Sequence, residues 1–369
     1  MKDQIPNKLK FILDNLIKNN IKPIIVGGSV RDYLYAKDIN DFDIEVYKIS
    51  DFNELENILS KYGEINVVGK SFGVLKLKVD GDIYDFSFPR LENKIGIGHK
   101  GFKVEIDPSL TYKEAAKRRD FTINSIGYDY KDNKFLDPYN GIKDIKSKIL
   151  KHIDDKKFCE DPLRVYRAIQ LCGRFELKVD KKTKGLCLDI IKTEEFKLLS
   201  LDRISDEYKK LLLKSQKPSY GLNLLNELKI QNINQDTIKN IDNMFSYKKD
   251  NIDDNIILMY YFLFDILQNI SNDKKLYKDI KKLQDFSIPK IFENDIKNIV
   301  NTSQFIVKKL DILKNMPKPF FMGKDLINLG YKPSKKFTYV LKSLYEMQLE
   351  GKISSKKQAE KYISTFFNN

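Results

Sequence analysis

An apolar run that ends in two glycines constrains the fold of this chain more than any other feature. Residues 24–26 are typical of a buried strand, Gly27 and Gly28 follow directly, and a helix-like stretch comes next. A glycine turn between a strand and a helix exposes backbone N–H groups that can hold a phosphate, and Arg31 lies one turn into the helix. For a Gly-Gly pair considered alone, an ordinary tight turn between a strand and a helix is the more common explanation.

Two aspartates follow this turn at a spacing that favours a metal site. Asp41 and Asp43 lie two apart on a predicted strand, so their side chains project from one face. Two carboxylates on one face repel each other unless a cation lies between them, and Mg²⁺ prefers oxygen ligands. If the pair is considered without its context, two acids that face water are the better explanation. The upstream Gly-Gly-x-x-Arg makes a metal site the stronger interpretation.

A third carboxylate, Asp85, lies in the alternating run of residues 84–88. If this strand pairs beside the strand of Asp41 and Asp43, three acids converge to hold two Mg²⁺ ions about 3.5–4 Å apart for an in-line phosphoryl displacement. A solvent-facing aspartate on an amphipathic strand explains Asp85 equally well.

Two downstream segments combine arginines with acceptors. Arg118 and Arg119 precede an alternating polar and apolar run, and a guanidinium suits bidentate contact with phosphate or ribose, although a surface basic cluster is the usual explanation. Asp161, before Pro162, can be the N-cap of a helix. Arg164 lies about one turn from Asp161, so the pair can instead offer an acceptor and donors to a base edge.

The chain changes character near residue 150. Short β-rich runs at 22–26, 42–46, 73–79 and 83–88 give way to long stretches with helical spacing, which predicts an α/β or α+β domain followed by nearly all helix. No apolar run is long enough to cross a bilayer, and three cysteines at no ligand-like spacing fit a reducing compartment. The expected location is the cytoplasm.

The sequence carries an excess of positive charge. It has 66 Lys and Arg residues against 52 Asp and Glu residues, a formal net charge of +14. Such an excess favours a polyanionic partner, but lysine-rich proteins can also be simply soluble. Charge alone therefore does not choose between these interpretations.

Taken in order, these segments resemble the class II tRNA nucleotidyltransferases, the CCA-adding enzymes and bacterial poly(A) polymerases of the polymerase-β-like superfamily. The matching segments are Gly27-Gly28-x-Val30-Arg31-Asp32, Asp41-x-Asp43, Arg118-Arg119-Asp120-Phe121-Thr122-Ile123-Asn124, Asp137-Pro138-x-x-Gly141-x-x-Asp144 and Glu160-Asp161-Pro162-Leu163-Arg164-x-x-Arg167. Residues 200–207 and, more loosely, 323–333 look like later helical motifs of the family.

The resemblance implies a mixed-sheet polymerase-β-like head (residues 1–150), a helical neck for base recognition (151–215), and a helical body and tail that bind tRNA (216–369). The implied activity is template-independent, Mg²⁺-dependent addition of C, C and A to the tRNA 3′ end from CTP and ATP, with release of pyrophosphate. The alternatives are a poly(A) polymerase, an A-only or CC-only adder, an idle RNA-binding protein, and nucleotidyl transfer to a small molecule.

The resemblance also implies roles for particular residues. Asp41 and Asp43 match the family's metal ligands, and Asp85 joins them as a candidate for the catalytic set. The implied nucleotide-binding residues are Gly28, Arg31, Arg119, Asp120, Asn124, Asp161, Arg164 and Arg167. Of these, Asp161 and Arg164 match the pair that reads the Watson–Crick edge of CTP or ATP. Gln170 stands where a further arginine is often found, which removes one charge from the nucleotide pocket.

Two segments favour complete CCA addition. Residues 90–102 form a basic, glycine-rich segment of the kind that, in this family, accompanies the switch from C to A addition, and it looks intact. Residues 68–74 also look more like the CCA-adding form than the poly(A) polymerase form.

Overall fold

The computed structural model describes residues 1–39, 41–69, 73–96, 98, 101–243, 250–251, 253–256, 278, 280, 317–349 and 351–368. The chain forms two compact units, Met1–Asn234 and Gln235–Asn369, which are described separately. The finer division at residues 150 and 215 stays a prediction. Residues 70–72, 97, 99 and 100, which belong to the two segments expected to mark a CCA-adding enzyme, lie outside the described residues.

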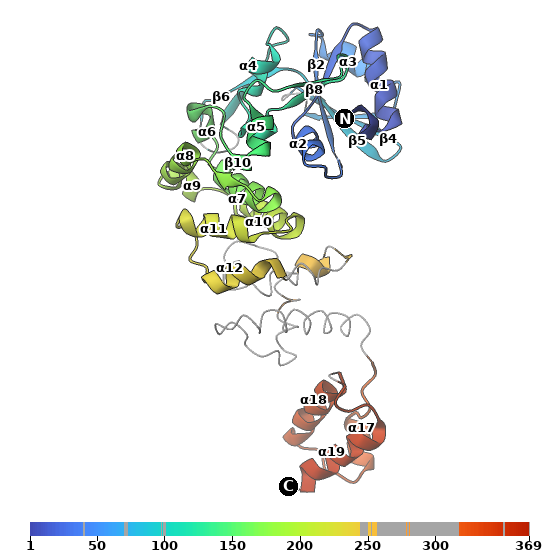
Figure 1. Ribbon diagram of the computed structural model, residues 1–369. Coiled ribbons are helices and arrows are strands. Elements are labelled where there is room, and N and C mark those ends of the chain that lie inside the picture. Colours follow the sequence, from blue (N-terminus) through green and yellow to red (C-terminus); the bar gives the residue numbers. More distant parts are fainter. Residues whose placement is uncertain are drawn as a thin grey trace. The chain divides into compact units, whose positions relative to one another are not determined.

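A seven-stranded mixed sheet organises the first unit (Figure 1), in the strand order β3-β4-β5-β2-β1-β8-β9. The strands are β1 (Lys22–Val26), β2 (Phe42–Tyr47), β3 (Glu64–Gly69), β4 (Val74–Val79), β5 (Asp82–Ser87), β8 (Gly127–Asp129) and β9 (Lys134–Leu136). β2 and β5 are parallel, whereas the other neighbours are antiparallel. All four predicted strands lie within one residue of an observed one, so the α+β head is confirmed.

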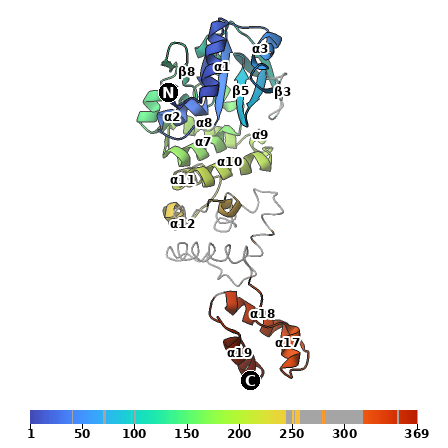
Figure 2. The ribbon, with the colours of Figure 1, turned by 90° about the vertical axis from the view of Figure 1, so that its right-hand side faces the viewer.

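The central strands β1 and β2 are mostly buried, the outer strand β4 buries one face, and an amphipathic helix covers the sheet. In β4, Leu75 and Leu77 are buried while Lys76 is exposed, which is the alternation of a strand with one apolar face. Helix α1 (Asn7–Lys18) buries apolar residues at helical spacing, including Leu9 and Leu16, and lies along the sheet (Figure 2).

Shorter elements connect the sheet to the helices that follow. They are η1 (Lys2–Gln4), α2 (Gly28–Leu34), α3 (Phe52–Leu59), the hairpin β6 (Arg90–Lys94) and β7 (Phe102–Ile106), α4 (Tyr112–Ala116), η3 (Thr122–Asn124), α5 (Gly141–Lys146), and the parallel pair β10 (Ile149–Leu150) and β11 (Lys178–Val179). The two-residue strand β11 interrupts the helical part that was predicted beyond residue 150.

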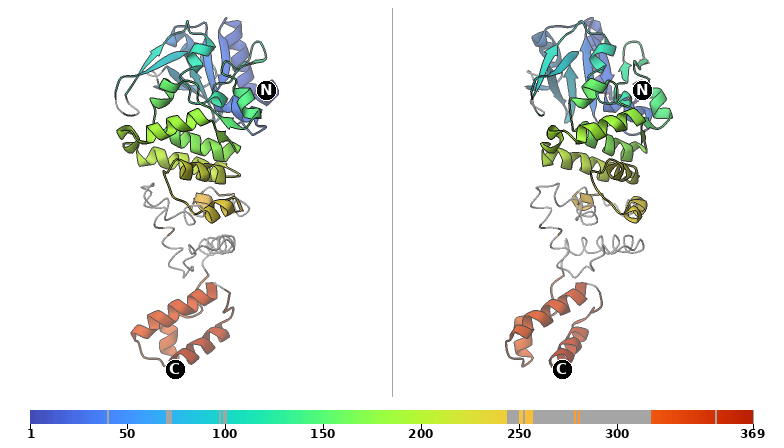
Figure 3. Two further views of the ribbon diagram at one scale, coloured as in Figure 1. Left: turned by 60° about the vertical axis from the view of Figure 1, so that its left-hand side comes forward. Right: turned by 90° about the vertical axis from the view of Figure 1, so that its left-hand side faces the viewer.

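The rest of the first unit is helical, as predicted. Its helices are α6 (Asp155–Cys159), α7 (Arg164–Phe175), α8 (Lys181–Ile191), α9 (Glu194–Lys197), α10 (Leu201–Lys214) and α11 (Ser219–Glu227). Helix α7 packs on both α10 and α11, and Figure 3 shows these helices as successive layers. Gly173 permits this close packing, because a Cβ there would lie 2.3 Å from Leu211 Cδ1.

The described part of the second unit is also helical. It contains α12 (Gln235–Ile241), α17 (Gly323–Asn328), α18 (Lys335–Leu349) and α19 (Lys356–Asn368). The last three share a hydrophobic core that includes Leu326, Val340, Leu344 and Ile363. Among the described residues, no helix has the length and apolar character needed to span a membrane.

Candidate active site

The strand register places two predicted carboxylates side by side at the middle of the sheet. Val26 of β1 is opposite Asp43 of β2, and Asp43 is opposite Asp85 of β5. Asp41 lies just before β2, and both Asp41 and Asp43 are exposed. The strand of Asp85 therefore does pair beside the strand of Asp43.

Asp85 also has a partner within the protein. Lys76 lies opposite it on β4, with Nζ 2.9 Å from Asp85 Oδ2. In the part of the chain that the structure describes, no group of three or more His, Cys, Asp or Glu side chains is arranged to hold a metal ion. The structure thus brings Asp85 next to Asp43 without forming a three-carboxylate metal cluster.

Asp43 lies in a setting that favours a bound cation. Desolvation raises its pKa above the ordinary value, the charges of Asp85 and Asp41 raise it further, and Arg119 and Lys76 oppose the rise. A nearby cation would relieve the repulsion between these carboxylates. Because Mg²⁺ is commonly held by one or two carboxylates together with substrate phosphates, Asp41 and Asp43 fit such an ion.

The predicted glycine turn is present and brings two charged groups to the end of β1. Gly27 has φ +77°, a backbone conformation that side chains rarely adopt, and α2 begins at Gly28. A Cβ at Gly27 would lie 3.3 Å from both Arg119 Nη1 and Asp43 Oδ2. The absence of a side chain at Gly27 therefore leaves room for this guanidinium and carboxylate.

A series of polar contacts links Arg31 to helix α7. Arg31 Nη1 donates to Asn124 Oδ1 at 2.7 Å, and Asn124 Nδ2 donates to Asp120 Oδ1 at 2.9 Å. Asp120 Oδ2 lies 2.7 Å from Nε and 2.6 Å from Nη2 of Arg167. Four of the predicted nucleotide-binding residues are thus in mutual contact, and their hydrogen bonds fix the side-chain positions.

Asp120 is a strongly acidic group in this series. Its burial would raise the pKa, but the charges of Arg167 and Arg164 and the hydrogen bonds from Asn124 and the Phe121 amide outweigh burial and lower the pKa to about 2. Asp120 is therefore ionised throughout the neutral pH range.

We expect Asp120 to stabilise the fold only while it is ionised. Folding lowers the pKa of Asp120 from 3.8 to about 2. Its contribution to the free energy of unfolding, roughly 2 kcal/mol, is therefore fully present above about pH 4 and is lost as the pH falls toward 2. Urea denaturation of the wild type and Asp120→Asn should show a difference in unfolding free energy that is largest near neutral pH and shrinks in acid. A difference that does not change with pH would contradict this role.

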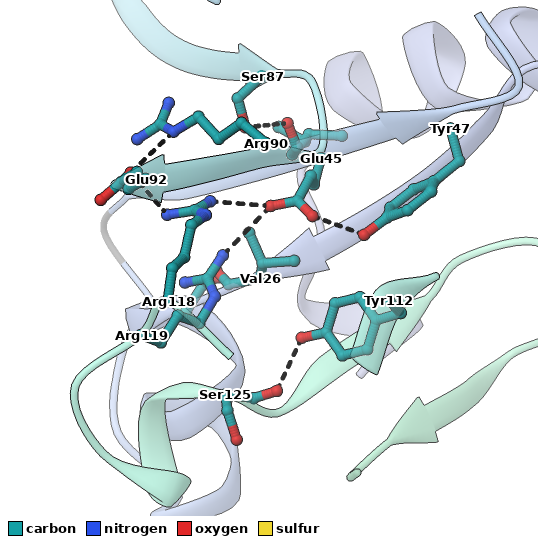
Figure 4. Close-up of polar contacts among 12 residues, drawn as sticks. Val26, Glu45, Tyr47, Ser87, Arg90, Glu92, Tyr112, Arg118, Arg119 and Ser125 are labelled. Carbon is teal, nitrogen blue, oxygen red and sulfur yellow. Dashed lines mark hydrogen bonds and ion pairs between the residues drawn. The ribbon is translucent and has the colours of Figure 1, made fainter. Parts of the chain in front are cut away.

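A buried glutamate, which the sequence analysis did not single out, holds the paired arginines (Figure 4). Glu45 is 1% exposed and accepts a hydrogen bond from Tyr47 Oη at 2.6 Å. Its Oε2 lies 3.1 Å from Arg118 Nη2 and 3.5 Å from Arg119 Nη2. Arg118 also lies 3.3 Å from Glu92 of the hairpin, so Arg118 ties the hairpin to the sheet while Arg119 faces Gly27.

The sequence does contain a signal for Glu45. It continues the i, i+2 series of Asp41 and Asp43, and the structure buries Glu45 where the two aspartates are exposed. A buried acid on a strand implies a cationic partner. In the structure the cationic partners of Glu45 are the paired arginines Arg118 and Arg119.

Asp161 and Arg164 lie at the start of α7, and hydrogen bonds within the protein hold both. Helix α7 begins at Arg164, so Asp161 is not its N-cap as the sequence had suggested. Asp161 Oδ1 instead accepts a hydrogen bond from the Leu163 amide at 3.1 Å. The same oxygen lies 3.7 Å from Arg203 Nη2. Arg164 donates to the carbonyl oxygens of Lys157 at 2.9 Å and Arg118 at 2.8 Å. Gln170 is buried on the same helix, and no partner for its Oε1 occurs in the described part of the chain.

A pocket of about 400 Å³ gathers acidic and basic groups beside the glycine turn. Its lining residues are Gly28, Ser29, Arg31, Asp32, Lys37, Asp38, Ile39, Asp41, Asp43, Arg174 and Lys214. Four of them were predicted site residues: Gly28, Arg31, Asp41 and Asp43. The other predicted site residues, namely Asp85, Arg119, Asp120, Asn124, Asp161, Arg164 and Arg167, lie outside this lining.

The pocket has the chemistry of a site for a metal-bound phosphate compound. Carboxylates suit the metal, and arginine and lysine suit the phosphates. Arg174 and Lys214 were not predicted, because their place in the pocket lining depends on how α7 and α10 pack. Lys37, which follows α2, was not predicted either.

The sheet, the carboxylate pair and the glycine turn define a nucleotidyltransferase head, and residues 24–151 match the family model described as the Poly A polymerase head domain. A multifunctional CCA protein from Stenotrophomonas maltophilia (strain K279a) is 34% identical over 210 residues, covering 56% of this chain and 49% of the relative. A CCA-adding enzyme from Buchnera aphidicola subsp. Baizongia pistaciae (strain Bp) is 30% identical over 263 residues, covering 70% of this chain and 59% of the relative.

The fold is also that of a solved relative. The crystal structure of the Bacillus stearothermophilus CCA-adding enzyme in complex with CTP superposes with a TM-score of 0.67 at 18% identity, covering 99% of each chain. The head-domain match and the two relatives make the chain similar to the CCA-adding nucleotidyltransferases, which are generally metal-dependent. The chain spans about half the length of the Stenotrophomonas relative and 59% of the Buchnera relative.

Proposed function

We propose that the chain is a Mg²⁺-dependent, template-independent CCA-adding tRNA nucleotidyltransferase, which adds C, C and A to the tRNA 3′ end from CTP and ATP. The observation that carries the proposal is the pocket that combines Asp41 and Asp43 with Gly28 and Arg31. The names of the two relatives and the CTP complex of the structural neighbour support the choice of substrates.

The reaction is an in-line displacement at the α-phosphate. Asp41 and Asp43 would hold Mg²⁺, which supplies Lewis-acid stabilisation of the charge that develops on the phosphoryl oxygens. The tRNA 3′-oxygen forms a bond to the α-phosphorus, the bond from that phosphorus to its bridging oxygen breaks, and pyrophosphate leaves. The proton of the attacking hydroxyl passes to one carboxylate of the set formed by Asp41, Asp43 and Asp85. Arg31 and Arg119 orient the phosphates, and their hydrogen-bond and ion-pair partners keep both guanidiniums in place.

Base selection is assigned to Asp161 and Arg164. Cytosine and adenine both place an exocyclic amine donor beside a ring acceptor, which is complementary to a carboxylate and a guanidinium. Two carbonyl oxygens orient Arg164 and use two of the five N–H donors of its guanidinium, so the others can reach a base. The contacts of Asp161 described above are made by Oδ1, and we assign acceptance from the amine to Oδ2.

The proposal assigns residues 1–150 to the head, 151–215 to the neck and 216–369 to a body and tail that bind tRNA. The formal charge of +14 supports a nucleic-acid partner. We include no membrane partner, and we place the reaction in the cytoplasm. Cys159, Cys172 and Cys187, which are all free thiols, support a reducing compartment.

The deciding experiment is incorporation of labelled CTP and ATP, separately and together, on tRNA transcripts that end at the discriminator base, at C and at CC. We expect growth by C, C and A followed by arrest. Open-ended A addition would instead identify a poly(A) polymerase, and arrest after CC or addition of A alone would identify a partial adder. No incorporation on any transcript would refute the proposal.

A further inference from the structure

Two backbone carbonyl oxygens orient the guanidinium of Arg164, and they come from separate segments of the chain. Arg164 Nη1 donates to the Lys157 carbonyl oxygen at 2.9 Å, and Nη2 donates to the Arg118 carbonyl oxygen at 2.8 Å. Lys157 belongs to α6, whereas Arg118 follows α4. The orientation of Arg164 therefore depends on what holds these two segments in place.

The hairpin residue Glu92 contacts both segments. Its Oε1 lies 3.3 Å from Arg118 Nη1 (Figure 4), and its carbonyl oxygen accepts a hydrogen bond from Lys157 Nζ at 2.5 Å. Burial raises the pKa of Glu92, but the charges of Arg118, Arg90 and Arg164 outweigh burial and lower it. Glu92, Arg118, Arg164 and Lys157 thus form a closed ring of contacts.

The Lys157 side chain ties α6 to the hairpin. Besides the Glu92 carbonyl oxygen, its Nζ donates to Asn93 Oδ1 at 3.3 Å and to Glu160 Oε2 at 3.2 Å. Helix α6 has five residues, which is too short to be stable alone, so its position depends on contacts with the rest of the protein. Phe158 anchors the helix in the core, and Lys157 anchors it to the hairpin.

We propose that Lys157 is a positioning residue for base selection. Its side chain fixes α6 against the hairpin, and its carbonyl oxygen thereby holds Arg164 in the orientation that meets the base edge. This assignment rests on the proposed function, which gives base selection to Asp161 and Arg164. Lys157 does not belong to the lining of the pocket beside the glycine turn. Its loss should therefore alter the choice of base more than the chemical step.

The chemistry of the base edge explains the expected change. A guanidinium is a planar fork of N–H donors, so a rotation of Arg164 redirects all of them together. CTP and ATP carry an exocyclic amine where UTP and GTP carry an oxygen. A misplaced guanidinium contacts the correct edge less well and rejects the wrong edge less strongly, so the difference between the two affinities becomes smaller.

The test is calorimetric titration of CTP and UTP with Mg²⁺ into the full chain, without tRNA. Lys157→Met keeps an unbranched side chain but removes its charge and donors. The matched control is Lys156→Met, at the exposed neighbour on the same helix. The wild type and the control should prefer CTP over UTP by the same ratio. Lys157→Met should lower that ratio about tenfold, the effect of one well-oriented hydrogen bond.

Two further variants test the contact itself. Lys157→Arg restores the charge and the donors, so it should return the ratio toward the wild-type value. Asn93→Ala removes one acceptor of Lys157 from the hairpin and should lower the ratio about threefold. Because Asn93 is exposed, this variant should fold normally and keeps the test decisive if Lys157→Met is unstable.

Incorporation kinetics separate positioning from a merely structural role. In Lys157→Met, KM for CTP and ATP should rise and U should be incorporated more often relative to C, while kcat with CTP stays near the wild-type value. An unchanged CTP-to-UTP ratio in both Lys157→Met and Asn93→Ala would overturn the proposal, as would a wild type that binds CTP and UTP equally. A wild type that incorporates nothing, but whose binding ratio depends on Lys157, would refute the CCA-adding function and support the positioning role.

Discussion

Replacing Asp43 by asparagine is expected to abolish nucleotide incorporation, with a loss in kcat on the order of 10³-fold or more. Asp43 lies beside the glycine turn and contributes one of the two carboxylates that fit a metal ion. The folded chain should tolerate the change, because it removes a negative charge that lies near the like charges of Asp85 and Asp41. Incorporation assays and urea denaturation together should therefore show lost activity without lost stability.

The control for this variant is Asp80→Asn. Asp80 is an exposed aspartate of the same sheet, in the turn after β4, and its partner is the exposed Lys8 at 2.7 Å. Its replacement should leave incorporation near the wild-type rate. If Asp43→Asn kept a rate similar to that of Asp80→Asn, the assignment of the metal site would be wrong.

Replacing Glu45 by alanine is expected to lower the free energy of unfolding by about 3–5 kcal/mol, the usual effect of removing one partner from a buried ion pair. The change leaves the mostly buried guanidiniums of Arg118 and Arg119 without the carboxylate that they share. Because Arg119 then loses its fixed position beside Gly27, KM for CTP and ATP should rise as well. Urea denaturation and nucleotide kinetics measure the two effects.

Glu105→Ala provides the comparison for Glu45→Ala. Glu105 is exposed on β7 and pairs with the exposed Lys103 at 2.6 Å, so its removal should change stability by about 1 kcal/mol or less. Glu45→Gln should fall between the two, since the amide oxygen still accepts hydrogen bonds but carries no charge. Equal stability of Glu45→Ala and Glu105→Ala would show that Glu45 does not hold the arginines.

The sequence predicted the parts of the molecule that depend on local patterns. The run from Lys22 to Val26, the turn at Gly27 and the spacing of Asp41 and Asp43 are each determined by a few neighbouring residues, and each is present in the structure. Backbone sterics and strand periodicity act over such short distances.

The parts that could not be predicted depend on contacts between distant segments. Lys76 pairs with Asp85 because β4 and β5 share a register, and alternation within either strand does not reveal that register. Arg174 and Lys214 reach the pocket because α7 and α10 pack together beside it. Helical spacing predicted those helices, but it did not indicate which of their ends meets the sheet.

The position of β1 has a consequence for the synthesis of the chain. Val26 pairs on one side with Asp43, which follows soon after, but its partner on the other side is Gly127, about a hundred residues later. A ribosome that adds about 5–20 residues per second needs several seconds to supply that partner. Throughout this interval the central strand of the future active site is an open edge, which can pair with other chains. A molecular chaperone would therefore protect this protein most while the head is being synthesised.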